Sequence, residues 1–181
     1  MTSSGVLDPA TAEDHTVQFR NAMASFPSGV TIVTTTGEEG GWTGFTATSF
    51  CSLSADPALV LVCLAKTASC HPAFLSARSW AIQVLPEHHA ELAVRFATRG
   101  ADKFARGEFS AGSDGHPVLA DACAVLECEA YARYDGGDHT ILVGRVTSTR
   151  LGEHPPTVYF RRDFHRLPVA SAPPSRPGRT E

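Results

Sequence analysis

The chain lacks the sequence motifs of several cofactor-binding classes. It has five cysteines but no Cys-x-x-Cys pair, and it has no His-Glu-x-x-His, no Walker A sequence and no Gly-x-Gly-x-x-Gly that opens a helix. These absences argue against zinc and iron–sulfur centres, P-loop nucleotide binding and a Rossmann unit. Cys123 and Cys128 lie five residues apart on one expected strand, so their side chains project to opposite faces and cannot share a metal. We expect reduced thiols and no bound metal.

Long apolar runs and a strong net charge are also missing. The longest apolar run, Ala58 to Ala65, is far too short to span a bilayer, and the N-terminus has no charged region followed by an apolar one. The formal net charge of −4 gives no general electrostatic reason to bind nucleic acid or an anionic membrane. We therefore expect a cytoplasmic protein without nucleic-acid or membrane partners.

The eight histidines show no metal-ligand spacing either. His88 and His89 are adjacent on an expected helix, where neighbouring side chains point about 100° apart, so we expect both to be solvated. The sequence context assigns others, near glycine, proline or charged residues, to loops or termini: His15, His116, His154 and His165.

What the chain does contain is a series of short strands with few helices. Its 181 residues, 43% of them hydrophobic, suit one domain with a sizeable core. Expected helices cover 13–25, 72–77 and 86–96. The first is amphipathic, and in the last Leu92, Ala93 and Phe96 lie on one face. Expected strands cover 30–36, 45–53, 58–65, 80–85, 122–134 and 139–146, with 58–65 buried on both faces.

Hairpin turns at 37–41 and 135–138 join two pairs of these strands, and 102–117 is loop-rich and a candidate lid. Many short antiparallel strands with two or three helices predict a mainly β fold, a β-barrel decorated by helices. We expect a disordered N-terminus over 1–12, one folded domain over 13–167 and a disordered tail rich in Pro, Ser and Arg over 168–181.

The strand 45–53 is the most informative segment, because its two faces differ in chemistry. One face carries Phe45, Ala47, Ser49, Cys51 and Leu53, and the other carries Gly44, Thr46, Thr48, Phe50 and Ser52. The first face suits a core, and the second offers hydroxyls that could hold a planar polar ring. A solvated surface strand is the alternative, since threonine is a good β-former.

A series of segments, in this order and spacing, resembles the short-chain flavin reductase family, the reductase components of two-component flavin-dependent monooxygenases. The segments are Phe19-Arg20, Phe26 to Val30, Phe45 to Phe50, Val62 to Ser69, Asp102-Lys103-Phe104, Gly137-Asp138-His139 and Val158-Tyr159-Phe160. Within the family the chain is most similar to reductases of aromatic polyketide hydroxylation, of the actinorhodin-pathway type. The resemblance implies a flavin-binding split β-barrel and a homodimer in which the second subunit helps to wall the flavin site.

The resemblance also implies an activity. An NAD(P)H:flavin oxidoreductase would reduce FMN, or FAD, with NADH or NADPH, and would release reduced flavin to a separate monooxygenase. The cofactors carry the electronic work of hydride transfer, so no acid–base dyad is required. Two alternatives stay open: a split-barrel flavoprotein that keeps its FMN and reduces another acceptor, and a flavin-binding carrier without useful NADH oxidation.

Site residues follow from the resemblance by position. The cofactor-binding set is Pro27, Ser28, Gly29 and Val30 beside the isoalloxazine, Thr46, Ala47, Thr48 and Ser49 at its polar edge, Leu64, Lys66, Thr67 and Ser69 toward the phosphate, and Lys103, Phe104 and Tyr159 near the groove. His139 is the candidate catalytic residue, contacting or orienting nicotinamide. Arg161 and Arg162 could face a 2′-phosphate or simply be exposed.

Each of these assignments has a structural alternative. Ser69 could be the N-cap of the helix at Pro72, and Lys66 an exposed lysine. Phe104 could anchor a loop beside a solvated Lys103. His139 could be a hairpin histidine bonded to Asp138 or Asp135, and Tyr159 and Phe160 could belong to the core of a last barrel strand.

Overall fold

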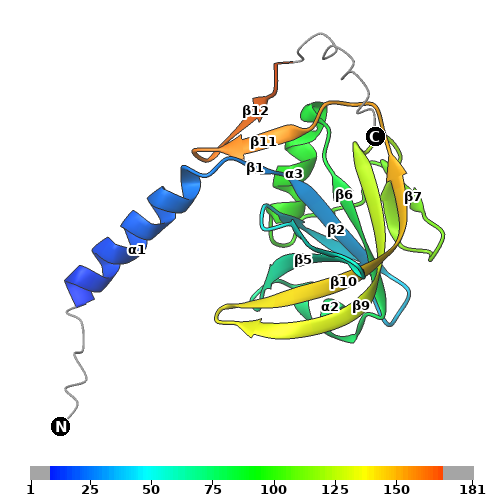
Figure 1. Cartoon of the computed structure of the whole chain (residues 1–181), viewed down its shortest axis with the longest axis horizontal. Coiled ribbons are helices and arrows are strands. Elements are labelled where there is room, and N and C mark those ends of the chain that lie inside the picture. The colour runs from blue at the N-terminus through cyan, green and yellow to red at the C-terminus, as the bar shows by residue number, and fades with distance from the viewer. Residues whose placement is uncertain (1–8, 169–181) are drawn as a thin grey trace, which may run out of the picture.

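The computed structural model describes residues 9–168, with side chains from residue 14 onward. The expectations for residues 1–8 and for the tail beyond Pro168 lie outside the described residues. Within the described part, a seven-stranded antiparallel sheet forms the body of the molecule (Figure 1). Its strands, in spatial order, are β3 (Trp42–Ala47), β2 (Thr31–Thr36), β6 (Ser79–Val84), β9 (Ala124–Gly136), β10 (His139–Leu151), β5 (Ala58–Ala65) and β4 (Cys51–Ala55).

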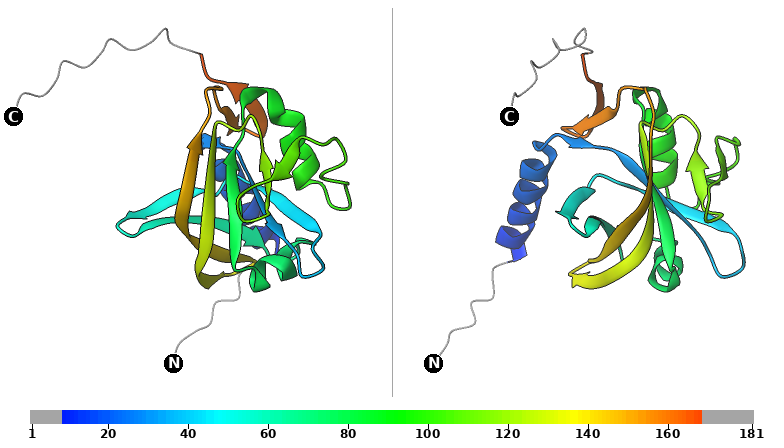
Figure 2. Two further views of the ribbon diagram at one scale, coloured as in Figure 1. Left: turned by 90° about the vertical axis from the view of Figure 1, so that its right-hand side faces the viewer. Right: turned by 45° about the vertical axis from the view of Figure 1, so that its right-hand side comes forward.

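The order of the strands explains how the sheet curls. β3 and β4 follow one another in the chain, yet they occupy opposite edges of the sheet. Only residues 48–50 connect them, so the two edges must approach each other (Figure 2). Bulges in the β9–β10 pair, after Val143 and after Val146, add local curvature. The prediction of a mainly β split barrel with a few helices is confirmed.

The predicted single strand over 45–53 is wrong, because the chain changes partners in its middle. β3 pairs with β2, whereas β4 pairs with β5, and residues 48–50 are not part of either strand. The expected core face holds only up to Ala47: Phe45 and Ala47 are buried, whereas Cys51 and Leu53 are exposed. Alternation along a strand cannot reveal such a change of edge.

Two apolar clusters of described residues lie on the two faces of the sheet. The inner one fills the barrel and includes Val33, Phe45, Val62, Leu64, Phe74, Trp80, Ile82, Cys128 and Leu142. The outer one includes Ile32, Ala81, Leu85, Leu92, Phe96, Phe109, Leu119 and Val125. β2 and β6 contribute to both clusters, so these strands are buried on both faces. β5 was expected to be buried on both faces, but it has one buried face and one half-exposed face.

One face of β5 is half-exposed because the elements that cover the outer cluster lie over β2 and β6 and leave β5 open. This outer cover consists of α3 (Ala90–Ala97), which follows the short 3₁₀ helix η1 (Glu87–His89), and of the hairpin β7 (Phe109–Ala111) with β8 (Pro117–Leu119). The predicted helix over 86–96 and its buried face are confirmed. β7 and β8 were not predicted: β7 lies within the expected loop 102–117, and β8 begins at its last residue. The helix α2 (His71–Ser76) adds Phe74 to the inner cluster.

Gly44 allows α3 to lie close against β3. A Cβ atom at this position would come within 2.6 Å of the Val33 carbonyl oxygen and 3.1 Å of the Phe96 ring. Any side chain would therefore push the helix away from the strand. α3 therefore packs closely over the face of β3 that carries Gly44 and Thr46.

The remaining elements form what we call the appendage: α1 (Pro9–Ala24) and a small sheet in the order β1 (Ser28–Gly29), β11 (Thr157–Phe160) and β12 (Asp163–Arg166). The predicted N-terminal helix is present and starts four residues earlier than expected. It extends away from the barrel (Figures 1 and 2), and its apolar Phe19 and Met23 are more than half exposed. The expectation that β11 is the last barrel strand is wrong. β11 pairs with β1 and β12 and belongs to the small sheet.

No helix among the described residues has both the length and the apolar character needed to cross a membrane.

Candidate functional site

Three adjoining hollows among the described residues lie where the barrel, the end of α3 and the appendage meet. The central hollow has about 430 Å³, the outer one beside α1 about 370 Å³ and the inner one about 260 Å³. Thr48, Tyr159 and Arg162 line both the central and the outer hollow. Ala97 and Thr98 line both the central and the inner one. We treat the three as one groove.

Eight of the predicted site residues line this groove. Val30, Thr46, Thr48 and Tyr159 line the central hollow. Ser28 lines the outer hollow, together with Thr48 and Tyr159. Thr67, Ser69 and Lys103 line the inner hollow. Residues far apart in the chain are therefore brought together as the resemblance implies. Pro27 and Gly29 flank Ser28 and are exposed, whereas Ala47 and Leu64 are buried in the inner cluster.

The hydroxyls expected to hold a polar ring edge have different local partners. The Thr46 hydroxyl donates to the Ala93 carbonyl oxygen over 2.6 Å, which ties β3 to α3. The Ser49 Oγ accepts from the Cys63 amide over 2.9 Å and thereby joins the 48–50 segment to β5. Thr48 is exposed and its hydroxyl has no partner among the described residues. Of the three hydroxyls, Thr48 is the one left available to a ligand.

Lys103 is not the solvated lysine of the structural alternative. Its Nζ donates to the carbonyl oxygens of Gly44 and Phe96, each over 2.8 Å. An ammonium group has three hydrogens, so one remains for the inner hollow. Burial lowers the pKa of Lys103, and the nearby Cys70 thiol partly offsets this.

Phe104, in contrast, does what the alternative predicts. Its ring makes edge-to-face contacts with Trp42, Phe96 and Phe109, with ring centroids 5.2 to 5.7 Å apart. These contacts anchor the loop that carries Lys103 against the outer cluster. Phe104 therefore positions Lys103 rather than lining the groove.

Ser69 is not an N-cap. α2 begins at His71, its N-cap position is taken by Cys70, and no side chain caps it. The hydroxyls of Thr67 and Ser69 thus line the inner hollow without a partner among the described residues. Arg99 lines the same hollow together with Lys103. Two cations and two unpaired hydroxyls make this end of the groove suitable for an anion.

Lys66 and His139 lie outside the groove. Lys66 forms an ion pair with Asp135, near the end of β9 beside the turn to β10. The His139 Nδ1 lies 2.7 Å from the Asp138 carboxylate, and this hydrogen bond lowers the pKa of Asp138. That contact is the one expected for a hairpin histidine. The His139 Nε2 has no partner among the described residues.

The helix α3 contributes to the site, which was not predicted from the sequence. Ala93, Val94 and Ala97 line the central hollow, and Arg162 and Phe164 complete its wall from the appendage. Ala93 and Ala97 are four residues apart and so lie on one face of the helix, where their small side chains leave space. This spacing was the available signal.

Taken together, the groove has apolar walls in its centre and cations and free hydroxyls at its inner end. Among the described residues, no aspartate or glutamate lines any of the three hollows. These features define a binding site for a planar ring that carries an anionic tail, such as a phosphorylated nucleotide-type cofactor. A flavin mononucleotide has this chemistry, and the residues present fit it.

The flavin reductase like domain family matches residues 23–168, and the chain belongs to this family. It is 49% identical over 162 residues to actinorhodin polyketide dimerase of Streptomyces coelicolor, covering 88% of this chain and 92% of the relative. It is 42% identical over 173 residues to NADH:riboflavin 5′-phosphate oxidoreductase of Streptomyces pristinaespiralis, covering 94% and 98%.

A solved structure shows the same fold. The NADH:FAD oxidoreductase of Streptomyces globisporus, in complex with NAD and FAD fragments, superposes with a TM-score of 0.82 at 33% identity. The match covers 93% of this chain and all of the other.

Proposed function

We propose that the protein is an NAD(P)H:flavin oxidoreductase that reduces FMN with NADH and releases the reduced flavin to a separate monooxygenase. The observation that carries this proposal is the groove, with its apolar centre and its cationic end free of acidic side chains. The names of the relatives support the same activity. FAD and NADPH remain the alternative substrates, and the relatives of polyketide and nitrophenol metabolism suggest an aromatic or polyketide context.

In this proposal FMN is bound along the groove. The isoalloxazine would lie in the central hollow against Val30 and Tyr159, with its polar edge toward Thr48. Its phosphate would lie in the inner hollow, where Lys103 and Ser69 would donate hydrogen bonds to it. Bound flavin supplies the ring that accepts a hydride from dihydronicotinamide. The groove would hold the two rings against each other in the orientation that hydride transfer requires.

His139 is the proposed nicotinamide contact. Its Nδ1 is fixed by Asp138, which leaves Nε2 to meet a ligand. Lys66 is proposed as a further cation for the phosphate, beside Lys103 and Arg99, once its exposed ion pair with Asp135 opens. Both roles rest on the family resemblance.

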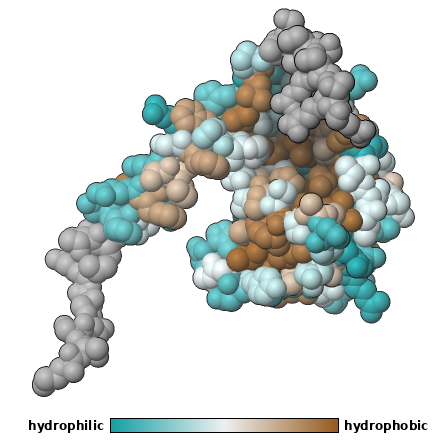
Figure 3. Space-filling view, viewed as in Figure 1, coloured by the Kyte–Doolittle hydropathy of each residue, from teal (hydrophilic) through white to brown (hydrophobic). Residues whose placement is uncertain are grey.

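The homodimer is also part of the proposal. Figure 3 shows apolar surface on α1 and on the barrel face opposite it, with open space between them. Phe19, Met23 and Phe26 are more than half exposed, and all three line the outer hollow. A second copy seated on this surface would bury these side chains and close the outer end of the groove. The five free cysteines fit a reducing, cytoplasmic location.

Anaerobic stopped-flow with NADH and a several-fold excess of FMN over subunits tests this function. We expect the whole excess to lose its oxidised-flavin absorbance, because flavin is a substrate that leaves. Reduction of a single equivalent would instead indicate a retained FMN and another acceptor, and binding without reduction a flavin carrier. In the same assay His139→Ala should slow flavin reduction or weaken NADH binding. An unchanged reduction rate and NADH affinity would contradict the assignment of His139.

A comparison of FMN with riboflavin tests the phosphate end of the groove. Ser69→Ala should weaken FMN binding by about tenfold, the value of one charge-assisted hydrogen bond, and leave riboflavin binding unchanged because riboflavin has no phosphate. Ser52→Ala, on the exposed strand β4, is the matched control. Equal losses for both flavins in Ser69→Ala would contradict the placement of the phosphate.

A further inference from the structure

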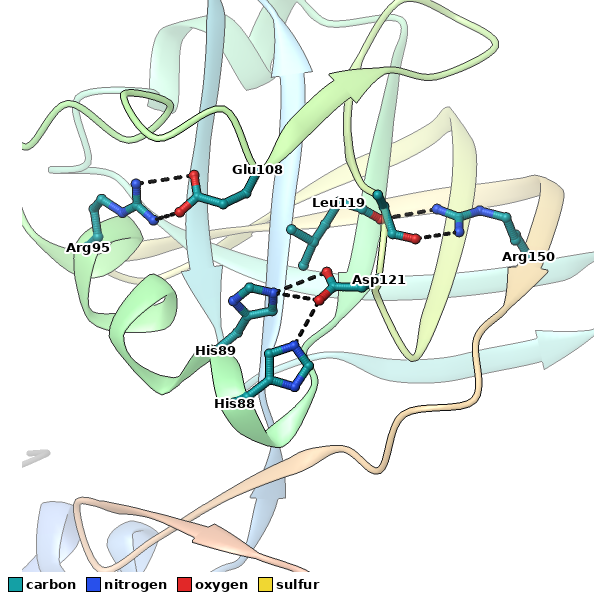
Figure 4. A network of polar contacts seen from close by, with 8 residues as sticks. His88, His89, Arg95, Glu108, Leu119, Asp121 and Arg150 are labelled. Carbon is teal, nitrogen blue, oxygen red and sulfur yellow. Dashed lines mark hydrogen bonds and ion pairs between the residues drawn. The ribbon is translucent and has the colours of Figure 1, made fainter.

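A cluster outside the groove joins His88, His89 and Asp121 (Figure 4). The His88 Nε2 lies 2.8 Å from Asp121 Oδ2, and the His89 Nε2 lies 3.0 Å from the same oxygen. His88 is exposed, as expected, whereas His89 is not, and both rings turn toward one carboxylate. His89 is largely buried, and His88 and Asp121 are partly exposed.

The cluster is held by segments that are distant in sequence and fixed in place. The histidines lie on η1, which leads directly into α3, and Asp121 lies just before β9. Arg150 of β10 donates to the carbonyl oxygens of Ala120 and Leu119, so the chain beside Asp121 is anchored (Figure 4). The Glu87 amide donates to the Pro155 carbonyl oxygen over 3.0 Å, which anchors η1.

We propose that His88, His89 and Asp121 form a binding site for a divalent transition-metal ion of the zinc class. Two imidazoles and one carboxylate are ligands that such ions accept. Metal–ligand bonds of about 2.0–2.1 Å place neighbouring ligand atoms roughly 3.0–3.4 Å apart in octahedral or tetrahedral sites. Here the imidazole nitrogens lie 2.8 to 3.1 Å from the carboxylate oxygens, and all three ligand atoms lie within 4.8 Å of one another, so small rotations of the side chains bring them to these separations around an ion.

Each imidazole ring can keep its proton when it binds a metal through Nε2. Without metal, each Nε2 carries the hydrogen that bonds Asp121. On metal binding Nε2 becomes the ligand and the proton moves to Nδ1, which in both rings has no hydrogen-bond partner among the described residues. The His154 ring lies 5.2 Å from the His88 ring, between centroids, and is the neighbouring group that could take a fourth position in place of water.

Cobalt(II) titration of the chelator-treated protein tests the site. We expect one ion per chain, visible d–d absorption and no thiolate charge-transfer band. His89→Ala should weaken binding by at least about tenfold, since even the partners of metal ligands change affinity that much. Two controls should bind as wild type: His165→Ala, an exposed histidine on β12, and Cys123→Ser, which removes the thiol nearest to Asp121 in sequence.

Thermal unfolding with zinc gives a second measurement. Zinc should raise the melting temperature of the wild type, because it binds the folded chain, and a chelator should reverse the rise. Asp121→Asn keeps the shape and one hydrogen-bond acceptor, so it should fold but lose the zinc-dependent rise. Absence of binding, equal binding by His89→Ala, or loss of binding in Cys123→Ser would each overturn the site. The result does not depend on whether the protein reduces flavin.

Discussion

The barrel and the appendage treat the same residue type in opposite ways. Phe74 of α2 is fully buried inside the barrel and contacts Phe45 edge-to-face, whereas Phe19 of α1 is 58% exposed. The barrel buries two continuous clusters of apolar side chains, together with Thr31, Thr34 and Thr35 of β2, within one chain. In the appendage, Tyr159 and Phe164 of the small sheet pack against the outer cluster, but Phe19 and Met23 of α1 are more than half exposed. A buried side chain stabilises the single chain, whereas an exposed apolar helix face is completed only by another surface.

Phe74→Ala is the change with the largest expected effect. It leaves a cavity in the inner cluster, and we expect a loss of about 3–5 kcal/mol in the free energy of unfolding. Phe19→Ala should change it by less than about 0.5 kcal/mol in dilute protein, but should remove any rise of stability with protein concentration. Urea denaturation at several protein concentrations measures both. Equal, concentration-independent losses would show that α1 is part of the core.

The buried Cys128 gives an alkaline test of the barrel. Burial raises the pKa of this thiol from 9.0 to about 12, with a smaller contribution from Glu127. Between these values the unfolded chain releases the proton and the folded chain keeps it. The stabilisation is therefore complete below pH 9.0 and falls by about 1.4 kcal/mol per pH unit above it.

Cys128→Ala should reduce that slope, and Cys51→Ala, at an exposed position on β4, should not. Denaturant midpoints taken from pH 9 upward give the slopes. Burial also raises the pKa values of Cys70 and Cys123, so a shallower slope should remain in Cys128→Ala. An identical slope in wild type and Cys128→Ala would mean that the barrel opens before this thiol titrates.

The smallest expected effect concerns a contact inside the appendage, between α1 and the turn that joins β11 and β12. The Arg162 guanidinium donates to the Asn21 side-chain oxygen over 2.7 Å, and it is an exposed contact. Asn21→Ala should cost about 1 kcal/mol or less and should speed amide exchange in α1 alone. Gln18→Ala, on the same helix, removes only a contact with Asp14 and is the control. Faster exchange throughout the barrel would contradict the separation of the two regions.

The sequence predicted the elements that local signals define. The bounds 58–65 match β5, and the helix after Pro86 and the hairpin around 135–138 lie where expected. Errors arose where a distant segment decides the outcome. Nothing local shows that the chain leaves one sheet edge at Ala47 and joins the other at Cys51, or that the outer cover lies over β2 rather than β5.

The same division holds for the groove. The resemblance named Thr46, Thr48 and Ser49 together, but their local hydrogen bonds depend on α3 and β5. His88 and His89 turn toward Asp121, which lies more than thirty residues away in the chain. Such contacts form only after the sheet and its cover have assembled, so residue spacing alone does not predict them.

The three-residue crossing between β3 and β4 has a consequence for how the chain folds. The crossing can take its final position only after β2 has paired with β6 and β5 has paired with β10. These pairings join segments about fifty and eighty residues apart in the chain. Until then both outer strands are open edges able to pair with other chains. Closing the crossing is therefore a late folding step, and the period before it is when a newly made chain is most exposed to aggregation.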